Sequence, residues 1–276
     1  MRAVLGIDAA WTLAQPSGVA LAAETIDGWR LIAVASSYQH FDALADDRLT
    51  REARPRGSMP DARALLASAT RLCGRPVDLV AIDMPLAHVP ITCRRASDNA
   101  VSRTYGARKC GTHTPSAARP GPISDALREG FKLSGYPLLT SAVSPPGVIE
   151  VYPHPALVEL ARSPSRLRYK ASKVRSYWPS VDGVERRRLL LREWDTIVSL
   201  LDREIAGVRE TMPTLGDLPT GIELKAYEDA LDAIVCAWVA ICALEGRAAP
   251  FGDDASAIWI PLPLETIEPT ITAVAR

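Results

Sequence analysis

The stretch from Tyr227 to Leu244 (YEDALDAIVCAWVAICAL) constrains the fold most, because it lacks Gly and Pro and is apolar around nearly the whole circumference of a helix. A helix that is apolar on all sides is a buried one. The twelve apolar residues from Ala233 to Leu244 are too few to span a bilayer, which takes roughly 20. We therefore expect the core helix of a globular protein.

The start of this helix carries three acidic residues, Glu228, Asp229 and Asp232, whose spacing of three and four places them on one face. Burying unpaired carboxylates is costly, and like charges this close raise each other's pKa. A positive group should therefore lie against them. It could be the helix N-terminus, which contributes roughly 0.3–1 kcal/mol per acid, or a divalent cation. The simpler alternative is an acidic first turn that only suits the helix dipole.

Composition and charge limit the classes of function. Thirty-two basic and thirty-two acidic residues cancel, and the sequence pI is about 6.9. A protein that coats nucleic acid without discrimination would be strongly basic, so this class is disfavoured. Five scattered cysteines and the lack of a secretory signal before the first apolar run predict a cytoplasmic protein without a membrane partner.

The order of apolar runs predicts a mixed α/β fold. Three strands joined by short turns come first and form an antiparallel meander, with the hairpin signal Asp27-Gly28 between the second and third. Helices and strands then alternate, which predicts a mixed sheet with helices on both faces. The expected strands are 3–10, 17–23, 29–36, 77–84, 148–152 and an edge strand at 258–262; the expected helices are 59–74, 92–105, 124–134, 155–161, 185–205 and 227–244. We expect a single domain over residues 1–276, with an irregular helical insertion at about 86–147.

Four acidic positions stand at the ends of these elements. Asp8 and Asp83 end apolar strands, Glu150 lies in a third strand, and Asp229 or Asp232 lies at the start of the core helix. Ligands collect at the carboxyl ends of strands in open α/β sheets, so these acids could converge on one site. Hard oxygen ligands suit Mg²⁺ or Mn²⁺, and two such ions can clamp the attacking and leaving oxygens of a phosphodiester.

At these residues the chain resembles a known family. The segments GIDAAW, SGVAL, AIDMPL, EVYPHPAL and DALDAIVCA are similar to those of the "domain of unknown function 429" family of predicted ribonuclease-H-like nucleases. The resemblance runs from about Ala3 to the end of the core helix. It implies a five-stranded mixed sheet whose first three strands are antiparallel, and hydrolysis of nucleic-acid phosphodiesters with one or two Mg²⁺ or Mn²⁺ ions.

The resemblance also implies roles for the acids. Asp8 matches the acid of the first strand and Asp83 the acid of the later strand. Asp229 and Asp232 resemble the paired aspartates of Holliday-junction resolvases, and Glu150 belongs to the family's own EVYP motif. We therefore expect Asp8, Asp83 and Asp232 to hold metal, with Asp229 and Glu150 assisting catalysis.

Two basic stretches could bind a phosphate backbone of DNA or RNA, and a solvated surface is the alternative for both. The proposed nucleic-acid contacts are Arg94, Arg95, Arg103 and Lys109 in the insertion, and Arg166, Arg168, Lys170 and Lys173 after the fourth helix. Neutral net charge favours a restricted, structured substrate. His154 and Trp11 are possible auxiliary residues beside the acids. His88, Cys93, Cys110 and His113 lack the spacing of a zinc knuckle, so we expect no structural zinc.

Two other functions stay open at this point. The first is a protein that binds nucleic acid, or acts as a scaffold, on a nuclease-like fold without cleaving. The second is a relative of actin-like ATPases and sugar kinases, which share the sheet plan. The sequence has neither a duplicated half nor a glycine-rich phosphate loop, which disfavours the second. The oligomeric state has no signal in the sequence.

Overall fold

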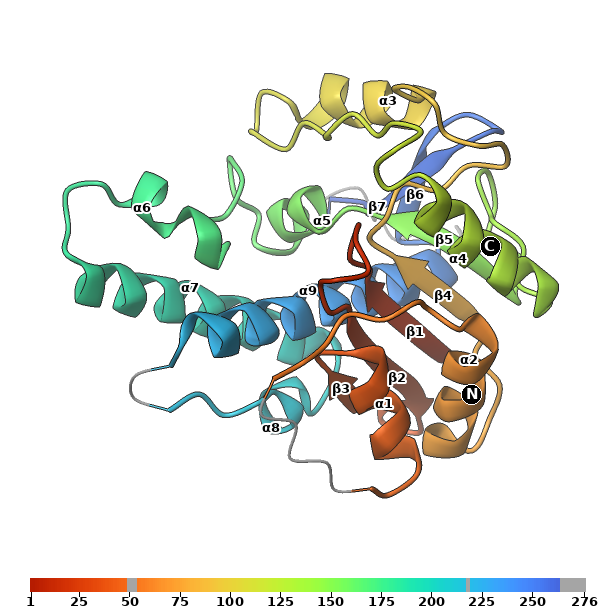
Figure 1. Ribbon diagram of the computed structural model, residues 1–276, viewed down its shortest axis with the longest axis horizontal. Coiled ribbons are helices and arrows are strands. Elements are labelled where there is room, and N and C mark those ends of the chain that lie inside the picture. The colour runs from red at the N-terminus through yellow and green to blue at the C-terminus, as the bar shows by residue number, and fades with distance from the viewer. Residues whose placement is uncertain (49–53, 217–218, 264–276) are drawn as a thin grey trace, which may run out of the picture.

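One mixed sheet organises the chain. The structure, a computed structural model, describes residues 1–48, 54–216 and 219–263. Within these ranges seven strands pair in the order β3-β2-β1-β4-β5-β7-β6 (Figure 1). The strands are β1 (Ala3–Asp8), β2 (Gly18–Thr25), β3 (Gly28–Ala35), β4 (Leu79–Ile82), β5 (Gly147–Val151), β6 (Ala248–Gly252) and β7 (Ala257–Pro261).

The antiparallel meander and the two parallel strands agree with the sequence analysis. β1, β2 and β3 are antiparallel neighbours, and β4 and β5 add to β1 in parallel. The expected number of five strands is wrong, because the chain after the core helix forms a further hairpin of β6 and β7. β7 is fully buried and pairs with β5, so it is not the expected edge strand. β6 (AAPFG) contains Pro and has no fully buried residue, so it lacks the apolar pattern from which a strand is predicted.

Helices cover both faces of the sheet, because successive side chains of each strand point to opposite sides. On one face, Val4 and Leu79 pack with α5, α7 and the core helix α9. On the other face, Leu5 and Val80 pack with α1, α2 and α4. The helices are α1 (Tyr38–Ala45), α2 (Ala62–Cys73), α3 (Ala96–Tyr105), α4 (Pro122–Leu133), α5 (Pro153–Leu160), α6 (Val174–Tyr177), α7 (Gly183–Glu204), α8 (Val208–Thr211) and α9 (Gly221–Leu244), with a short 3-10 turn at Ala171–Lys173.

α1 and α4 differ from the expected pattern, and the short helices α6 and α8 were not expected either. α1 was not expected; Ser37 caps it by accepting a hydrogen bond from the His40 amide at 3.1 Å. α4 lies in the expected insertion, yet its Leu127 and Phe131 are buried in the same cluster as α2. Part of the insertion therefore completes one helical layer of the sheet.

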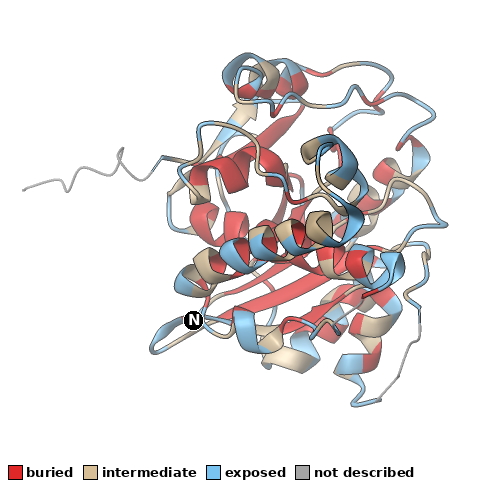
Figure 2. Ribbon diagram, turned by 90° about the vertical axis from the view of Figure 1, so that its left-hand side faces the viewer, coloured by how far each residue is buried: buried red, intermediate tan, exposed pale blue. Residues whose placement is uncertain are grey.

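The core helix α9 lies unusually close to β1 and β2. A Cβ atom added to Gly6 would lie 2.2 Å from the Ala233 carbonyl oxygen, and one added to Gly18 would lie 2.0 Å from that of Asp229. These glycines, together with alanines such as Ala20 and Ala233, let the two backbones approach. Figure 2 shows the central strands of the sheet as buried, and most residues of α9 are buried as well. No helix in the described ranges is both long enough and apolar enough to cross a membrane.

We predict that Gly6→Ala destabilises the protein by about 1–3 kcal/mol or more, because overpacking a well-filled core forces the backbone to shift. Gly183→Ala is the control, since a methyl group there meets no atom within 4 Å. That variant should be neutral or slightly more stable. The measurement is the free energy of unfolding in urea. A Gly6→Ala protein as stable as the control would contradict the close approach of α9 to β1.

Candidate functional site

Two aspartates stand at the carboxyl ends of adjacent parallel strands. Asp8 is the last residue of β1, and Asp83 directly follows β4 and extends the pairing through its amide, which donates to the Ile7 carbonyl at 2.9 Å. Asp8 shares its face of the strand with Gly6, and Asp83 shares its face with Ala81. Both therefore face α9, and both side chains are partly exposed. The strand ends thus place two carboxyl groups side by side, as the sequence predicts.

The aspartates of α9 lie further inside their helix than expected. α9 begins at Gly221, where Thr220 and Glu223 form a capping box. Asp229 is thus more than two turns from the first residue, and Asp232 is three turns from it. The favourable field of a helix N-terminus fades within the first turn, so it does not compensate these buried acids. The expected first-turn position is wrong, and another positive group has to balance them.

Lys170 is the first of these groups. Its ammonium forms ion pairs with Asp232 and, at 3.4 Å, with Glu228. The preceding Tyr169 is buried and donates its hydroxyl to Asp232 Oδ1 at 2.9 Å. The amide of Ala171 donates to Glu228 Oε2 at 2.6 Å. Both oxygens of Asp232 are therefore occupied by the segment that follows α5.

Lys225 is the second positive group, one helical turn before Asp229. It pairs with Asp229 Oδ1 and lies 3.6 Å from Glu228. The other oxygen of Asp229, Oδ2, is buried without a hydrogen-bond donor. The Asp8 carboxyl is within hydrogen-bonding reach of Asp229. Two carboxyl groups in such contact must share a proton or a cation.

The charges at this point do not balance. We call Asp8, Asp83, Asp229 and Asp232 the acid cluster. Together with Glu228 it sets five carboxyl groups against two ammonium groups. Burial, and then repulsion from Asp232 and Asp229, raises the pKa of Asp8 well above its ordinary value. Burial and Asp232 raise the pKa of Asp83 to about 7. Burial likewise raises the pKa of Asp229.

Glu150, expected among these acids, has another partner. Its side chain shares the face of Val148, opposite to α9, and is buried. It forms a two-pronged ion pair with Arg95, with nitrogen–oxygen distances of 2.5 and 2.7 Å, and accepts the Leu86 amide at 2.7 Å. Arg95 also pairs with Asp98 at 2.9 Å. Glu150 and Arg95 therefore hold the chain that follows Asp83, and neither is available as a ligand or a phosphate contact in this structure.

The other expected basic contacts fall into two groups. Arg94 is engaged locally, with hydrogen bonds to Asn99, Thr114 and Ser102. Lys170 is engaged by Asp232, as described above. Exposed side chains remain at Arg103, Lys109, Arg168 and Lys173, and a partly exposed one at Arg166.

The two possible auxiliary residues lie on opposite sides of the sheet. His154 is buried between Tyr152 and Tyr169, and its ring centroid lies 5.3 Å from that of each tyrosine. The hydroxyl of Tyr169 in turn donates to Asp232. Burial and the nearby Lys170 lower the pKa of His154 well below its ordinary value. Trp11 packs against the opposite helical layer, under the guanidinium of Arg119.

Residues 137–257 match the model of a family described as "Protein of unknown function (DUF429)". This part of the chain is similar to the DUF429 family. The matched residues include EVYPHPAL and DALDAIVCA; the segments with Asp8 and Asp83 lie outside the DUF429 match. No curated protein and no solved structure matches the chain.

Sequence reasoning missed the two lysines that pair with the acids of α9. Lys225 had a readable signal, since it precedes Glu228 by three residues and Asp229 by four. Lys170 was expected to bind nucleic acid, and only the folded path of the segment after α5 brings it onto α9. In the part of the chain that the structure describes, no group of three or more His, Cys, Asp or Glu side chains is arranged to hold a metal ion.

We predict that Arg95→Met destabilises the protein by about 3–5 kcal/mol, because it leaves two buried carboxylates without their partner. Arg103→Met is the matched control; Arg103 is exposed on the neighbouring helix α3, and its replacement should change stability by about 0.5 kcal/mol at most. Urea unfolding of both variants provides the measurement. Equal stability of the two variants would show that the Arg95 network does not hold this segment.

We predict that Asp83 makes the metal-free protein less stable as pH rises. Its pKa is about 7 in the folded chain and about 4 in an unfolded one. Between these values the folded state binds more protons, so the free energy of unfolding falls by up to about 1.4 kcal/mol per pH unit. Asp83→Asn removes this contribution. Urea unfolding with a chelator present, at about pH 5 and pH 7, should show a smaller fall in the variant, and an unchanged fall would refute the assignment.

Proposed function

We propose that this chain is a metal-dependent phosphodiesterase that hydrolyses nucleic acid on a ribonuclease-H-like fold, in one domain with an insertion after β4. Two features of the sheet support the fold. The order β3-β2-β1-β4-β5, with three antiparallel strands followed by two parallel ones, is the plan that the family resemblance implies. The hairpin of β6 and β7 then extends that plan at one edge.

The observation that carries the function is the convergence of the acid cluster. Asp8 and Asp83 come from neighbouring strand ends and meet Asp229 and Asp232 of α9, and only two ammonium groups balance them. An excess of buried negative charge has to be neutralised by protons or by cations. A site of this charge at the carboxyl edge of a sheet is typical of catalysis.

The donor chemistry of the cluster fits Mg²⁺ or Mn²⁺. All its ligand atoms are carboxylate oxygens, which these hard cations prefer. Asp8 and Asp83 are partly exposed, so a cation can reach them from solvent, and Asp229 Oδ2 has no donor of its own. Asp8, Asp83 and Asp229 would hold the ion, whereas Asp232 has both oxygens engaged by Tyr169 and Lys170. A bound ion would supply a Lewis acid and lower the pKa of water for attack on a phosphodiester.

The lysines would have separate tasks in this enzyme. Lys170 is four-fifths buried and fixed between Asp232 and Glu228, so it would hold Asp232 in place. Lys225 is half exposed, and its long side chain can leave Asp229 without disturbing the core. We therefore assign Lys225 as the ammonium that a cation displaces.

A nucleic-acid-binding protein without cleavage is the second function that the structure favours. The specific observation is that Lys170 and Lys225 already pair with three of the acids, and that the described side chains form no ready metal site. In that case the acids would be structural. The actin-like ATPase alternative gains no such observation.

The test of the metal site is a calorimetric titration of Mn²⁺ into the wild type and Asp8→Asn. We predict saturable binding that the substitution abolishes without unfolding the chain, followed by cleavage of branched, hybrid or single-stranded nucleic acid by the wild type only. A folded Asp8→Asn protein that still cleaves would overturn the assignment. Absence of Mn²⁺ binding, even with an oligonucleotide present to supply phosphate ligands, would favour the non-catalytic function.

The same titration tests the displaced lysine. Lys225→Met should bind Mn²⁺ several-fold more tightly than the wild type, because the cation no longer has to replace an ion pair that contributes roughly 0.2–1 kcal/mol. Lys132→Met is the matched control, since Lys132 forms an exposed pair with Glu129 at 3.8 Å on α4. Equal affinities in all three proteins would show that Lys225 does not compete with metal.

A further inference from the structure

A cavity of about 570 Å³ lies beside the acid cluster and has no role in the function proposed so far. Three distant segments line it: the loop between β1 and β2, residues 54–57, and the first two turns of α9. Its volume is in the range of about 300–1,000 Å³ that is typical of ligand sites. Two of these segments approach closely at Gly57, where an added Cβ atom would lie 2.3 Å from the Leu13 carbonyl oxygen.

The cavity is positively charged. Arg54, Arg56 and Lys225 line it, and no Asp or Glu occurs among its described lining residues. Within the described ranges, Lys225 forms ion pairs with acids of α9, whereas no carboxylate pairs with Arg54 or Arg56. Guanidinium groups that line a cavity and have no carboxylate partner among the described residues favour an anion, and they match phosphate geometry in particular.

Apolar groups complete the walls. Leu13 and Ile222 are 46 % and 43 % exposed, which is high for large aliphatic side chains, and Pro16 and Pro55 also line the cavity. Such surfaces accept the flat faces of a base or the carbon side of a sugar. Basic groups beside an apolar wall are the combination that binds single strands of nucleic acid.

Lys225 connects this cavity to the acid cluster. Its side chain lines the cavity while its ammonium contacts Asp229, which itself lies against Asp8. The loop that forms another wall begins directly after Asp8 and Ala9, and the Ala10 amide donates to Ser17 Oγ at 3.0 Å. The side chain of Lys225 would therefore lie between a phosphate bound by the arginines and the carboxylates of the acid cluster.

We propose that this cavity binds one nucleoside phosphate unit of a nucleic-acid strand, next to the phosphodiester that enters the acid cluster. This inference rests on the proposed function, because it assigns the place of the substrate strand. Arg54 and Arg56 bind the phosphate, and the surface of Leu13 and Ile222 takes the base. The shared chemistry of a strand and a free nucleotide is the nucleoside phosphate, and we assign the strand because the cavity opens beside the site of cleavage.

The test uses the full chain with a chelator present, so that binding is measured without metal or cleavage. The probe is a fluorescein-labelled oligothymidylate, and its anisotropy is recorded over a range of salt concentrations. For the double variant Arg54→Gln/Arg56→Gln we expect weaker binding. The slope of log affinity against log salt is negative, and it should become less steep by about 0.7 for each phosphate that the variant no longer neutralises.

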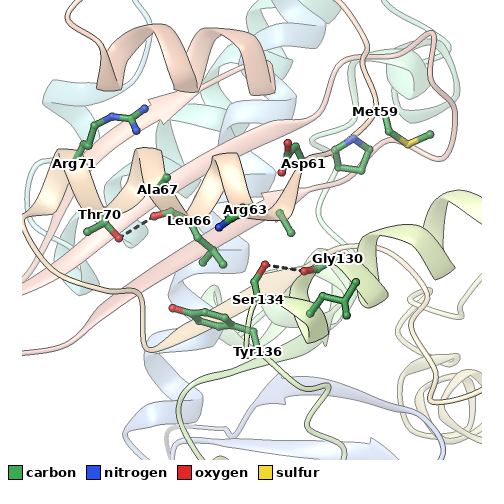
Figure 3. A pocket seen from close by; sticks show the side chains of 13 residues that line it. Met59, Asp61, Arg63, Leu66, Ala67, Thr70, Arg71, Gly130, Ser134 and Tyr136 are labelled. Atoms are coloured by element: carbon green, nitrogen blue, oxygen red, sulfur yellow. Dashed lines mark hydrogen bonds between the residues drawn. The ribbon is translucent and has the colours of Figure 1, made fainter.

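A matched control removes the same charge elsewhere. A larger cavity, of about 1,230 Å³, lies between α2 and α4 and is lined by Arg63 and Arg71 (Figure 3). Both arginines belong to α2, on the sheet face opposite to α9. Arg63→Gln/Arg71→Gln should therefore leave affinity and salt slope close to those of the wild type.

Each result decides between the alternatives. Weaker binding in the first double variant alone supports the strand site, even if the wild type never binds Mn²⁺, and the cavity would then belong to a non-catalytic protein. Equal weakening in both double variants, or no binding of single-stranded or duplex oligonucleotide by the wild type, overturns the site. If thymidine monophosphate displaces the probe and binds as tightly as the oligonucleotide does, the ligand of the cavity is a free nucleotide, and the proposal of a strand is overturned.

Discussion

The structure depends on the close contact between α9 and the first two strands. Gly6 and Gly18 remove the side chains that would keep the helix away, and the alanines of α9 fill the narrow space. Because α9 lies so near to β1, its Asp229 meets the Asp8 carboxyl at the end of that strand. The acid cluster is therefore a consequence of backbone packing. A larger residue at either glycine would change the spacing of the carboxyl groups as well as the stability of the core.

Burying these carboxyl groups sets the second constraint. The surroundings provide ordered donors for Asp232 and Glu228, through Tyr169, Lys170 and the Ala171 amide. They provide less for Asp8, Asp83 and Asp229, whose pKa values are raised by burial. Asp232 and Glu228 are thus held by ordered donors, whereas the negative charge of Asp8, Asp83 and Asp229 is not fully balanced. Preorganised structure on one side and unbalanced charge on the other is the arrangement expected of a site that acts on a ligand.

The sequence predicted the parts of the fold that are set by local pattern. Apolar runs located the meander, β4, β5 and β7, and the all-apolar stretch located α9, because burial on both sides leaves a clear signal. The expected convergence of Asp8 and Asp83 followed from strand ends alone. Glu150 was expected among the other acids, but its side chain points to the opposite face of the sheet. The register of β5 decides this face, and a shift of one residue would reverse it. Lys170 and Arg95 were predicted as nucleic-acid contacts, because Asp232 and Glu150 lie far away in the chain and only tertiary structure brings these partners together.

The position of Lys225 links the three proposals. It neutralises Asp229, lines the cavity with Arg54 and Arg56, and is the most exposed of the charged groups at the cluster, being half exposed on a four-carbon stem. A phosphate in the cavity attracts this ammonium away from Asp229. The carboxylate that it leaves behind then needs a cation. Binding of the strand and binding of the metal would therefore favour each other through one side chain, since thermodynamic linkage is reciprocal.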